Sequence, residues 1–298
     1  MIENIETLAA LSEAGTMTKA GTRLRISQSA VSKRIDALES AMGRKLVEPV
    51  GRRVRLTAAG IQLLEKTAPF MAALKEAVAV ESPVQAGRLV IGISESILSS
   101  WGSRVLAGVA QAIPQMELVI NAHRSPVAID HVRSGEYMLA LCADRGEYSA
   151  DVKSEPLVDE PMVLVPSGLE PFQLRRDTTV PVITIEPHAS TWVHLKPRIR
   201  ALSVRWNIHI ETEQTLQSFA GIAQMARCGF GHGLVPLGIA RALGISDRGL
   251  IRFPEPGLSR PIALVGRSTT FARPIVRSFH SILRKTIPSN LMSCPENI

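Results

Sequence analysis

The chain has 298 residues, of which 45% are hydrophobic and 20% are charged, and its formal net charge is +7. This length allows two domains, and the composition excludes extensive disorder. No run of about 18 apolar residues occurs, so no membrane span is expected. The first residues include Glu3 and Glu6 and no basic stretch before an apolar one, which argues against a secretory signal and predicts a cytoplasmic protein.

The three cysteines are far apart in the sequence, at Cys142, Cys228 and Cys294. No Cys-x-x-Cys pair or His–Cys cluster is present, so we expect no metal site, and no cofactor is predicted. Free cysteines are most often small buried hydrophobes. A redox switch through Cys142 and Cys228 is the alternative.

Positive charge is concentrated near the N-terminus. Residues 1–60 contain ten Lys or Arg and six Asp or Glu, a difference of +4 out of the +7 of the whole chain. More than half of the excess therefore lies in a fifth of the sequence. Such a local excess predicts a surface that meets phosphates.

The same segment predicts three helices, from helical spacing of apolar residues and from Thr, Ser and Gly at their ends. The first helix ends at Gly15, the second runs from a cap at Thr16 or Thr18 to Leu24, and the third runs from a cap at Ser27 to about Met42 before Gly43.

The third helix has two different sides. Its apolar residues recur at spacings of four, three and four, at Val31, Ile35, Leu38 and Met42. The opposite side carries Gln28, Ser29, Ser32, Lys33 and Asp36. Gln can make a bidentate contact with adenine, and Ser and Lys can reach base edges or phosphates. This pattern is typical of a recognition helix in a DNA major groove, and a solvated helix face is the alternative.

Two short β-prone runs follow, Lys45–Val47 and Val54–Leu56, on either side of Gly51, Arg52 and Arg53. They predict a hairpin with two arginines at its tip. An Arg-Arg pair alone usually marks a solvated turn. Beside a recognition helix, it becomes a candidate contact to phosphate or to the minor groove.

These residues together resemble the signature of LysR-type transcription regulators over residues 3–62. The matching stretches are Gly15 to Ala20 (GTMTKA), Leu24, Ser27 to Ser32 (SQSAVS), Ile35, Leu38-Glu39, Gly43, Leu46 and Arg53 to Gly60 (RVRLTAAG). The chain departs from the family at Gly21, where an Ala is usual, and at Leu46 to Pro49, where the family has Leu-Phe-x-Arg. The resemblance implies a winged helix-turn-helix over residues 1–58. The candidate DNA contacts are Ser27, Gln28, Ser29, Ser32, Lys33, Arg34, Arg52 and Arg53.

A long amphipathic helix is predicted from Thr57 to about Glu81, within a connector that spans residues 59–87. Its apolar seam comprises Ile61, Leu64, Ala68, Met71, Leu74 and Val78. Such a seam needs a partner outside a core. The resemblance implies pairing with the same helix of a second subunit, in a homodimer or in a homotetramer that is a dimer of dimers. Pro69 either kinks this helix or breaks it, in which case the seam is local core.

After Gly87 the pattern alternates between strands and helices, which predicts an α/β domain with mostly parallel strands. The expected strands are Leu89–Ile93, Leu118–Ala122, Leu139–Cys142, Met162–Val165, Val182–Ile185, Leu234–Pro236 and Ile262–Val265. The expected helices end at about Ala112 and Ser134 or span 191–202, 215–228 and 271–286. The resemblance implies a two-lobed effector domain of periplasmic-binding-protein type over residues 88–298. Lobe I would be 88–158 with 266–298, and lobe II would be 162–262. In this comparison, the stretch from Leu157 to Val165 resembles the first crossover between the lobes.

Open α/β sheets bind ligands where strands end and helices begin. Polar residues stand at three such places. The candidate effector contacts are Ser94, Glu95, Ser96, Ser125, His188, Ser190, Thr191 and Trp192. Simple helix caps are the alternative for the Ser and Thr residues, and core packing is the alternative for Trp192. The expected effector is an amino acid or a small carboxylate, with Glu95 available to an amino group.

The resulting prediction is a sequence-specific DNA-binding transcription regulator under effector control. Its expected partners are double-stranded DNA and a small molecule, and RNA polymerase is a further candidate. An α/β enzyme is the first alternative, but the chain lacks a Gly-x-Ser-x-Gly elbow and a phosphate loop. The paired acids Asp159 and Glu160 are expected to face solvent, so no catalytic residues are assigned. A solute-binding protein is the second alternative, but it would need a secretory signal and no helix-turn-helix.

Overall fold

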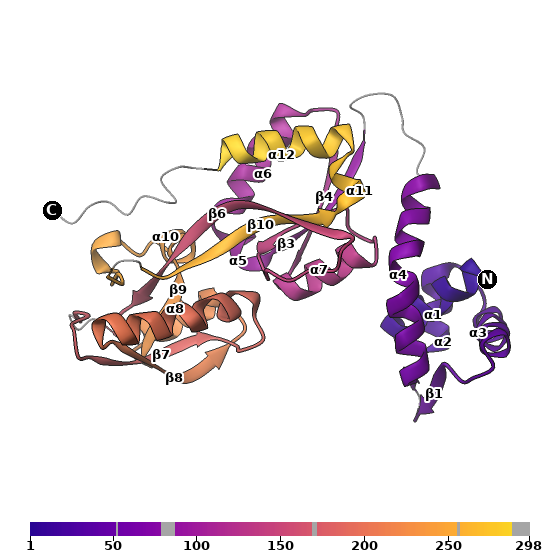
Figure 1. The fold of residues 1–298 in the computed structure, drawn as a ribbon, viewed down its shortest axis with the longest axis horizontal. Coiled ribbons are helices and arrows are strands. Elements are labelled where there is room, and N and C mark those ends of the chain that lie inside the picture. The colour runs from indigo at the N-terminus through magenta and orange to yellow at the C-terminus, as the bar shows by residue number, and fades with distance from the viewer. Residues whose placement is uncertain (52, 79–86, 169–171, 255–256, 288–298) are drawn as a thin grey trace. The chain divides into compact units, whose positions relative to one another are not determined.

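The computed structural model describes residues 1–298 except 52, 79–86, 169–171, 255–256 and 288–298 (Figure 1). Its contacts divide the chain into two units, residues 1–80 and residues 81–298, which are described separately. Within the described residues, none of the helices combines the length and the apolar character that a membrane crossing requires.

The first unit is a small helical domain with a hairpin. Its elements are α1 (Ile2–Ala14), α2 (Met17–Leu24), α3 (Gln28–Met42), β1 (Val47–Val50), β2 (Arg53–Leu56) and α4 (Ala58–Val78). The predicted helix ends are confirmed. Gly15 and Gly43 end α1 and α3 with φ of 68° and 65°, a backbone region that glycine enters without strain. The Thr16 side chain caps α2 by accepting a hydrogen bond from the Lys19 amide.

The apolar stripe of α3 holds this unit together. Val31, Ile35 and Leu38 are buried against Leu8 and Leu11 of α1. Met42, the last residue of the stripe, is half-buried and packs at the edge of the same cluster. The inward face of α3 is therefore buried in the core of this unit, and its outward face remains available to a partner.

The hairpin differs from its prediction in position. The first strand begins at Val47, two residues later than expected, and extends through Pro49. The reason is a competing partner, because the amides of Leu46 and Val47 donate hydrogen bonds to the Glu39 carboxylate at 2.8 and 3.2 Å. The strands pair antiparallel, with Val47 opposite Leu56 and Val50 opposite Arg53.

The connector helix α4 is continuous from Ala58 to Val78 and does not break at Pro69. Leu63 and Leu64, in its first turns, pack against the core of the first unit. Further along, Phe70 is 75% exposed and Leu74 is 40% exposed. Part of the predicted seam is therefore local core, and part of the helix exposes large apolar side chains.

The second unit contains an eight-stranded sheet in the order β4-β3-β5-β10-β6-β9-β7-β8. Its strands are β3 (Arg88–Ser94), β4 (Glu117–His123), β5 (Leu139–Ala143), β6 (Val152–Val165), β7 (Thr179–Ile185), β8 (His209–Leu216), β9 (His232–Pro236) and β10 (Ser259–Arg267). Its helices are α5 (Glu95–Ile97), a π-helix η1 (Leu98–Gly102), α6 (Ser103–Ala112), α7 (Ser125–Arg133), α8 (Ser190–Trp206), α9 (Phe219–Arg227), α10 (Leu237–Ala242), a 3-10 helix η2 (Asp247–Gly249), α11 (Ser268–Phe271) and α12 (Pro274–Thr286).

Two long strands, β6 and β10, cross between the halves of this unit (Figure 1). They pair antiparallel, with Ser259 opposite Pro161 and Arg267 opposite Val152. We call the half with β3, β4, β5 and α12 the first lobe, and the half with β7, β8, β9 and α8 the second lobe. The sheet is mixed rather than mostly parallel, because both crossover strands run antiparallel to their neighbours.

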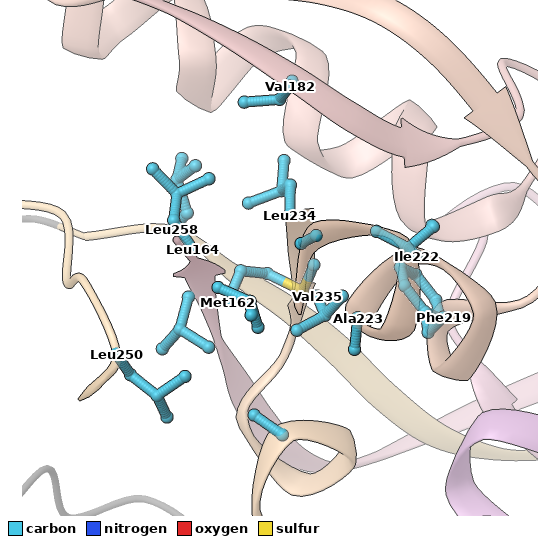
Figure 2. Close-up of a cluster of buried hydrophobic side chains, with 14 of the residues drawn as sticks. Met162, Leu164, Val182, Phe219, Ile222, Ala223, Leu234, Val235, Leu250 and Leu258 are labelled. Atoms are coloured by element: carbon cyan, nitrogen blue, oxygen red, sulfur yellow. The ribbon is translucent and has the colours of Figure 1, made fainter. Parts of the chain in front are cut away.

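Each lobe has its own hydrophobic core. In the second lobe, Met162 and Leu164 of β6 pack with Leu234 of β9 and Ile222 of α9 (Figure 2). In the first lobe, Phe279 of α12 belongs to a separate cluster with residues of β3, β5 and α6. Two separately packed halves joined by two strands give a firm frame on either side of the junction between them.

Four elements of the second unit were missed from the sequence, namely β8, α10 and the short helices η2 and α11. β8 has the sequence HIETEQTL and lies at the edge of the sheet, where most of its side chains are exposed. An edge strand needs few apolar residues, so it lacks the usual pattern. The expected helix 215–228 begins only at Phe219, because its first residues belong to β8. The six-residue helix α10 was also absent from the prediction.

Candidate functional site

The outward face of α3 carries the polar side chains that the sequence singled out. Ser27 caps the helix, because its hydroxyl accepts a hydrogen bond from the Ala30 amide at 3.1 Å. The Ser29 hydroxyl lies 2.9 Å from the Ser27 hydroxyl. Gln28, Ser29 and Lys33 are exposed, and Ser32 is half-buried. The face is thus polar, open and fixed in place by the buried stripe behind it.

Arg34 lies away from this face. Successive helix residues are rotated by about 100°, which moves Arg34 a further step round from Lys33. Its guanidinium donates hydrogen bonds to the Glu3 carboxylate at 2.5 Å and to the Thr7 hydroxyl at 3.5 Å. In this structure, Arg34 connects α3 to α1 instead of joining the outward face.

Of the two arginines predicted at the hairpin tip, the structure describes one. Arg53 is exposed at the start of β2. Arg52 lies outside the described residues. Arg55, two residues beyond Arg53, forms a 2.6 Å ion pair with Glu48 on the opposite strand. Arg53 is therefore the described tip residue that presents its charge to solvent.

A buried carboxylate joins α3 to the hairpin. Glu39 accepts hydrogen bonds from Lys45 and from the amides of Leu46 and Val47. Burial works to raise the pKa of Glu39, but these hydrogen bonds and the Lys45 charge outweigh it, so the pKa lies below its usual value. The ionised carboxylate thus sets the angle at which the hairpin leaves the helix.

The second unit contains a pocket where the two lobes meet, with about 440 Å³ of empty space that includes some open solvent. Six of the eight predicted effector contacts line it, namely Ser94, Glu95, Ser96, Ser125, Ser190 and Thr191. His188 and Trp192 are not among its lining residues. His188 is exposed, and Trp192 packs against the core of the second lobe.

Two helices of more than one turn begin at this pocket without a side-chain cap. The residues preceding them are Arg124 before α7 and Ala189 before α8. The amides of a first helical turn carry partial positive charge and favour an anion. At the start of α8, the Ser190 hydroxyl is buried, with 3% of the residue exposed, and has no hydrogen-bond partner among the described residues. The pocket wall thus contains two uncapped helix starts and one buried hydroxyl group, that of Ser190, without a partner in the described part of the chain.

Glu160 and Arg260 form a buried ion pair at this site. The prediction that Glu160 faces solvent is wrong: Glu160 is fully buried, whereas its neighbour Asp159 is exposed. Adjacent strand residues point to opposite sides, so the two acids of β6 have opposite environments. The Arg260 guanidinium of β10, only 1% exposed, donates to the Glu160 carboxylate at 2.9 and 2.7 Å.

The rest of the Glu160 carboxylate is held from both sides of the junction. The Trp101 indole of η1 donates to it at 3.2 Å, and the Gly238 amide of α10 donates at 3.3 Å. Arg260 in turn donates to the Ser96 hydroxyl at 2.9 Å and lines the pocket. Buried charges persist only where such partners satisfy them.

An ion pair also spans the pocket from one lobe to the other. Arg124 precedes α7 in the first lobe, and Glu186 follows β7 in the second lobe. Their side chains form an ion pair, and both residues line the pocket. Arg124, Glu186 and Arg260 were not among the predicted contacts. The adjacent Ser125 was the available signal for Arg124.

The described cysteines lie away from the pocket lining. Cys142 is buried in β5, and burial, with the Asp144 charge adding to it, raises the pKa of its thiol. Cys228 is exposed after α9. Among the residues that the structure describes, no group of three or more His, Cys, Asp or Glu is arranged to hold a metal ion.

Comparison with known proteins gives the same division of the chain. Residues 2–61 match the family described as "Bacterial regulatory helix-turn-helix protein, lysR family", and residues 83–288 match the "LysR substrate binding domain" family.

Full-length relatives and solved structures are also similar. An "Uncharacterized HTH-type transcriptional regulator" of Vibrio cholerae is 27% identical, over 98% of this chain and 99% of its own. A "Probable hydrogen peroxide-inducible genes activator" of Mycobacterium avium is 27% identical, over 97% of this chain and 94% of its own. The structure of a full-length OxyR variant from Pseudomonas aeruginosa shares the fold, with a TM-score of 0.69 and 19% identity over 96% of this chain and 94% of that one.

Proposed function

The chain belongs to the LysR family of bacterial transcription regulators, and we propose that α3 reads its operator through Ser27, Gln28, Ser29, Ser32 and Lys33. The observation that carries this proposal is the two-sided environment of the helix. Val31, Ile35 and Leu38 are buried, while Gln28, Ser29 and Lys33 are exposed at its N-terminal end. Arg53, and Arg52 beyond the described residues, would contact phosphates beside it. Arg34 supports this surface through α1.

The second unit would bind a small effector, an amino acid or a small carboxylate, in the pocket between its lobes. The convergence of Ser94, Ser96, Ser125, Ser190 and Thr191 on one cavity supports this proposal. One of the relatives bears the name of a peroxide-inducible activator. Because the pocket lining contains no cysteine in the described residues, we favour ligand binding over thiol oxidation.

The active form would be a homodimer through α4, or a homotetramer that is a dimer of dimers. The exposed apolar side chains of α4, Ile61, Phe70 and Leu74, support such pairing. Pairing two copies of α3 would match two half-sites about one DNA turn apart. The site of action would be the cytoplasm, and RNA polymerase would be a further partner. Effector binding between the lobes would change how the paired first units sit on DNA.

A gel-shift titration of the full chain on the DNA next to its own gene tests operator reading. Gln28→Ala should weaken specific binding by about 1–3 kcal/mol and leave non-specific binding unchanged. Ser40→Ala, at an exposed position near the other end of α3, is the matched control and should bind like the wild type. Equal affinity of the Gln28 variant and the wild type for the operator would contradict the assignment.

A further inference from the structure

Arg260 combines a charge with almost complete burial at the wall of the pocket. A guanidinium has five N–H donors. In Arg260, two of them are bound to Glu160 and one to the Ser96 hydroxyl. The ring of Phe219, another lining residue, lies 5.2 Å from the guanidinium carbon. The remaining two N–H groups have no acceptor among the residues that the structure describes, so an acceptor supplied by a ligand would complete the set.

A second group in the same pocket also lacks its partner. The Ser190 hydroxyl is buried and forms no hydrogen bond with the described part of the chain, and it stands in the uncapped first turn of the 17-residue helix α8. A buried polar group without a partner is costly, so the Ser190 hydroxyl gains from a ligand acceptor that reaches it. The donors of Arg260, Ser190 and the first turn of α8 all line one cavity. Together they offer several donors to one group of acceptor oxygens, which a carboxylate supplies.

The charges around the pocket limit how negative that ligand can be. The Arg260 charge is already compensated by Glu160, and the Arg124 charge is compensated by Glu186. Glu95 adds a further negative charge to the lining. A doubly charged anion would meet uncompensated repulsion here, whereas a single carboxylate can use the planar guanidinium and the hydroxyl together.

We infer that Arg260 binds the carboxylate of the effector, together with Ser190, and that Glu160 acts as the positioning residue that holds the guanidinium in place. This inference rests on the effector pocket of the proposed function. Glu160 is fixed by Trp101 of the first lobe and by Gly238 of the second lobe. The bound carboxylate therefore lies one side chain away from a contact that joins both lobes and both crossover strands.

A binding screen on the full-length chain tests the assignment. The probes are the common L-amino acids and short monocarboxylates, each paired with its carboxamide, together with inorganic phosphate and sulfate. Thermal shift identifies the binders, and calorimetry gives their Kd. We expect at least one carboxylate to stabilise the wild type, while its carboxamide, phosphate and sulfate do not. If no carboxylate stabilises the chain, or if the carboxamide binds equally well, the inference is overturned.

Variants then locate the anion partner. Arg260→Lys should weaken carboxylate binding about 10- to 100-fold, because a charge-assisted hydrogen bond is lost while the charge remains. Ser190→Ala should weaken it about 3- to 30-fold. Arg241→Lys is the control, since Arg241 pairs with Asp247 and does not line the pocket. If Arg260→Lys fails to fold, Ser190→Ala and Ser96→Ala carry the test, and unchanged affinity in both overturns the inference.

Operator binding without any added probe separates this inference from the proposed function. If the wild type binds its operator but shows no preference for carboxylate over carboxamide, only the assignment of Arg260 is overturned. If the preference is present and depends on Arg260 but the chain binds no DNA, operator reading by α3 fails while the carboxylate site stands.

Discussion

Arg124 and Glu186 join the two lobes of the second unit by an ion pair at the effector pocket. The Arg124 side chain is 49% exposed and that of Glu186 is 20% exposed, so solvent weakens the attraction between them. The pair also bears on ligand binding. Glu186 neutralises the charge of Arg124, and this charge would otherwise attract an anionic ligand.

Removing this competition should favour ligand binding. We expect Glu186→Gln to raise the affinity of the pocket for a carboxylate several-fold, since the ionised partner that Arg124 has in the structure is then gone. The free energy of unfolding should fall by no more than about 1 kcal/mol. Calorimetry of the variant, with Glu211→Gln on the exposed edge strand as control, measures the change. A lower affinity would mean that Glu186 instead binds a cationic group of the ligand.

Glu39 should make the first unit sensitive to acid. Its pKa in the folded state lies below the ordinary value of 4.5, so its stabilisation is fully present above pH 4.5 and is lost as the pH falls through the folded pKa. Glu39→Gln should lower the free energy of unfolding by about 1–3 kcal/mol at neutral pH and flatten the loss in acid. Hydrogen exchange at the Leu46 and Val47 amides gives a local readout. Exchange that is equally slow in the variant would rule out this role.

Gly238 should tolerate no side chain. A Cβ there would lie 2.5 Å from a Glu160 carboxylate oxygen and 2.9 Å from the Trp101 ring, both buried and held by hydrogen bonds. Gly238→Ala should therefore destabilise the second unit by about 1–3 kcal/mol through overpacking. Gly249→Ala, where no described atom lies within 4 Å of the added Cβ, is the matched control. Equal melting temperatures of the two variants would disprove the close packing.

The arginines of the first unit should separate into two classes. Arg53→Ala should flatten the dependence of log K on log salt by about one unit, because each phosphate contact adds about 0.9 to the slope. Arg34→Ala should leave the slope unchanged and lower the stability of the first unit by up to about 1 kcal/mol, since Arg34 pairs with Glu3. Affinity titrations at several salt concentrations, with thermal unfolding of both variants, distinguish them. A salt slope that falls for Arg34→Ala and not for Arg53→Ala would reverse the assignment.

The sequence was most informative where local signals are sufficient. The caps at Thr16 and Ser27, the stops at Gly15 and Gly43, and the stripe of α3 depend only on neighbours a few residues away. Six pocket residues could likewise be predicted, because polar side chains between a strand end and the next helix start mark the ligand-binding edge.

The remaining features depend on partners that are distant in the chain. Arg260 is separated by 100 residues from Glu160, and neither residue carries a local sign that it is buried. A charged side chain is placed at the surface by default, and only the pairing of β6 with β10 brings its counterion to it. Arg124 and Glu186 were missed for the same reason, since their contact exists only when the two lobes meet.

The return of the chain through β10 has a consequence for biosynthesis. The second lobe comprises mostly residues between the two crossover strands, whereas the first lobe needs β10 and α12 from the C-terminal end to fill its sheet and core. During translation, the strands and helices between residues 88 and 143 must wait for the last segments to leave the ribosome. A nascent chain stalled before Pro274 would therefore leave the apolar side of α6 uncovered by α12.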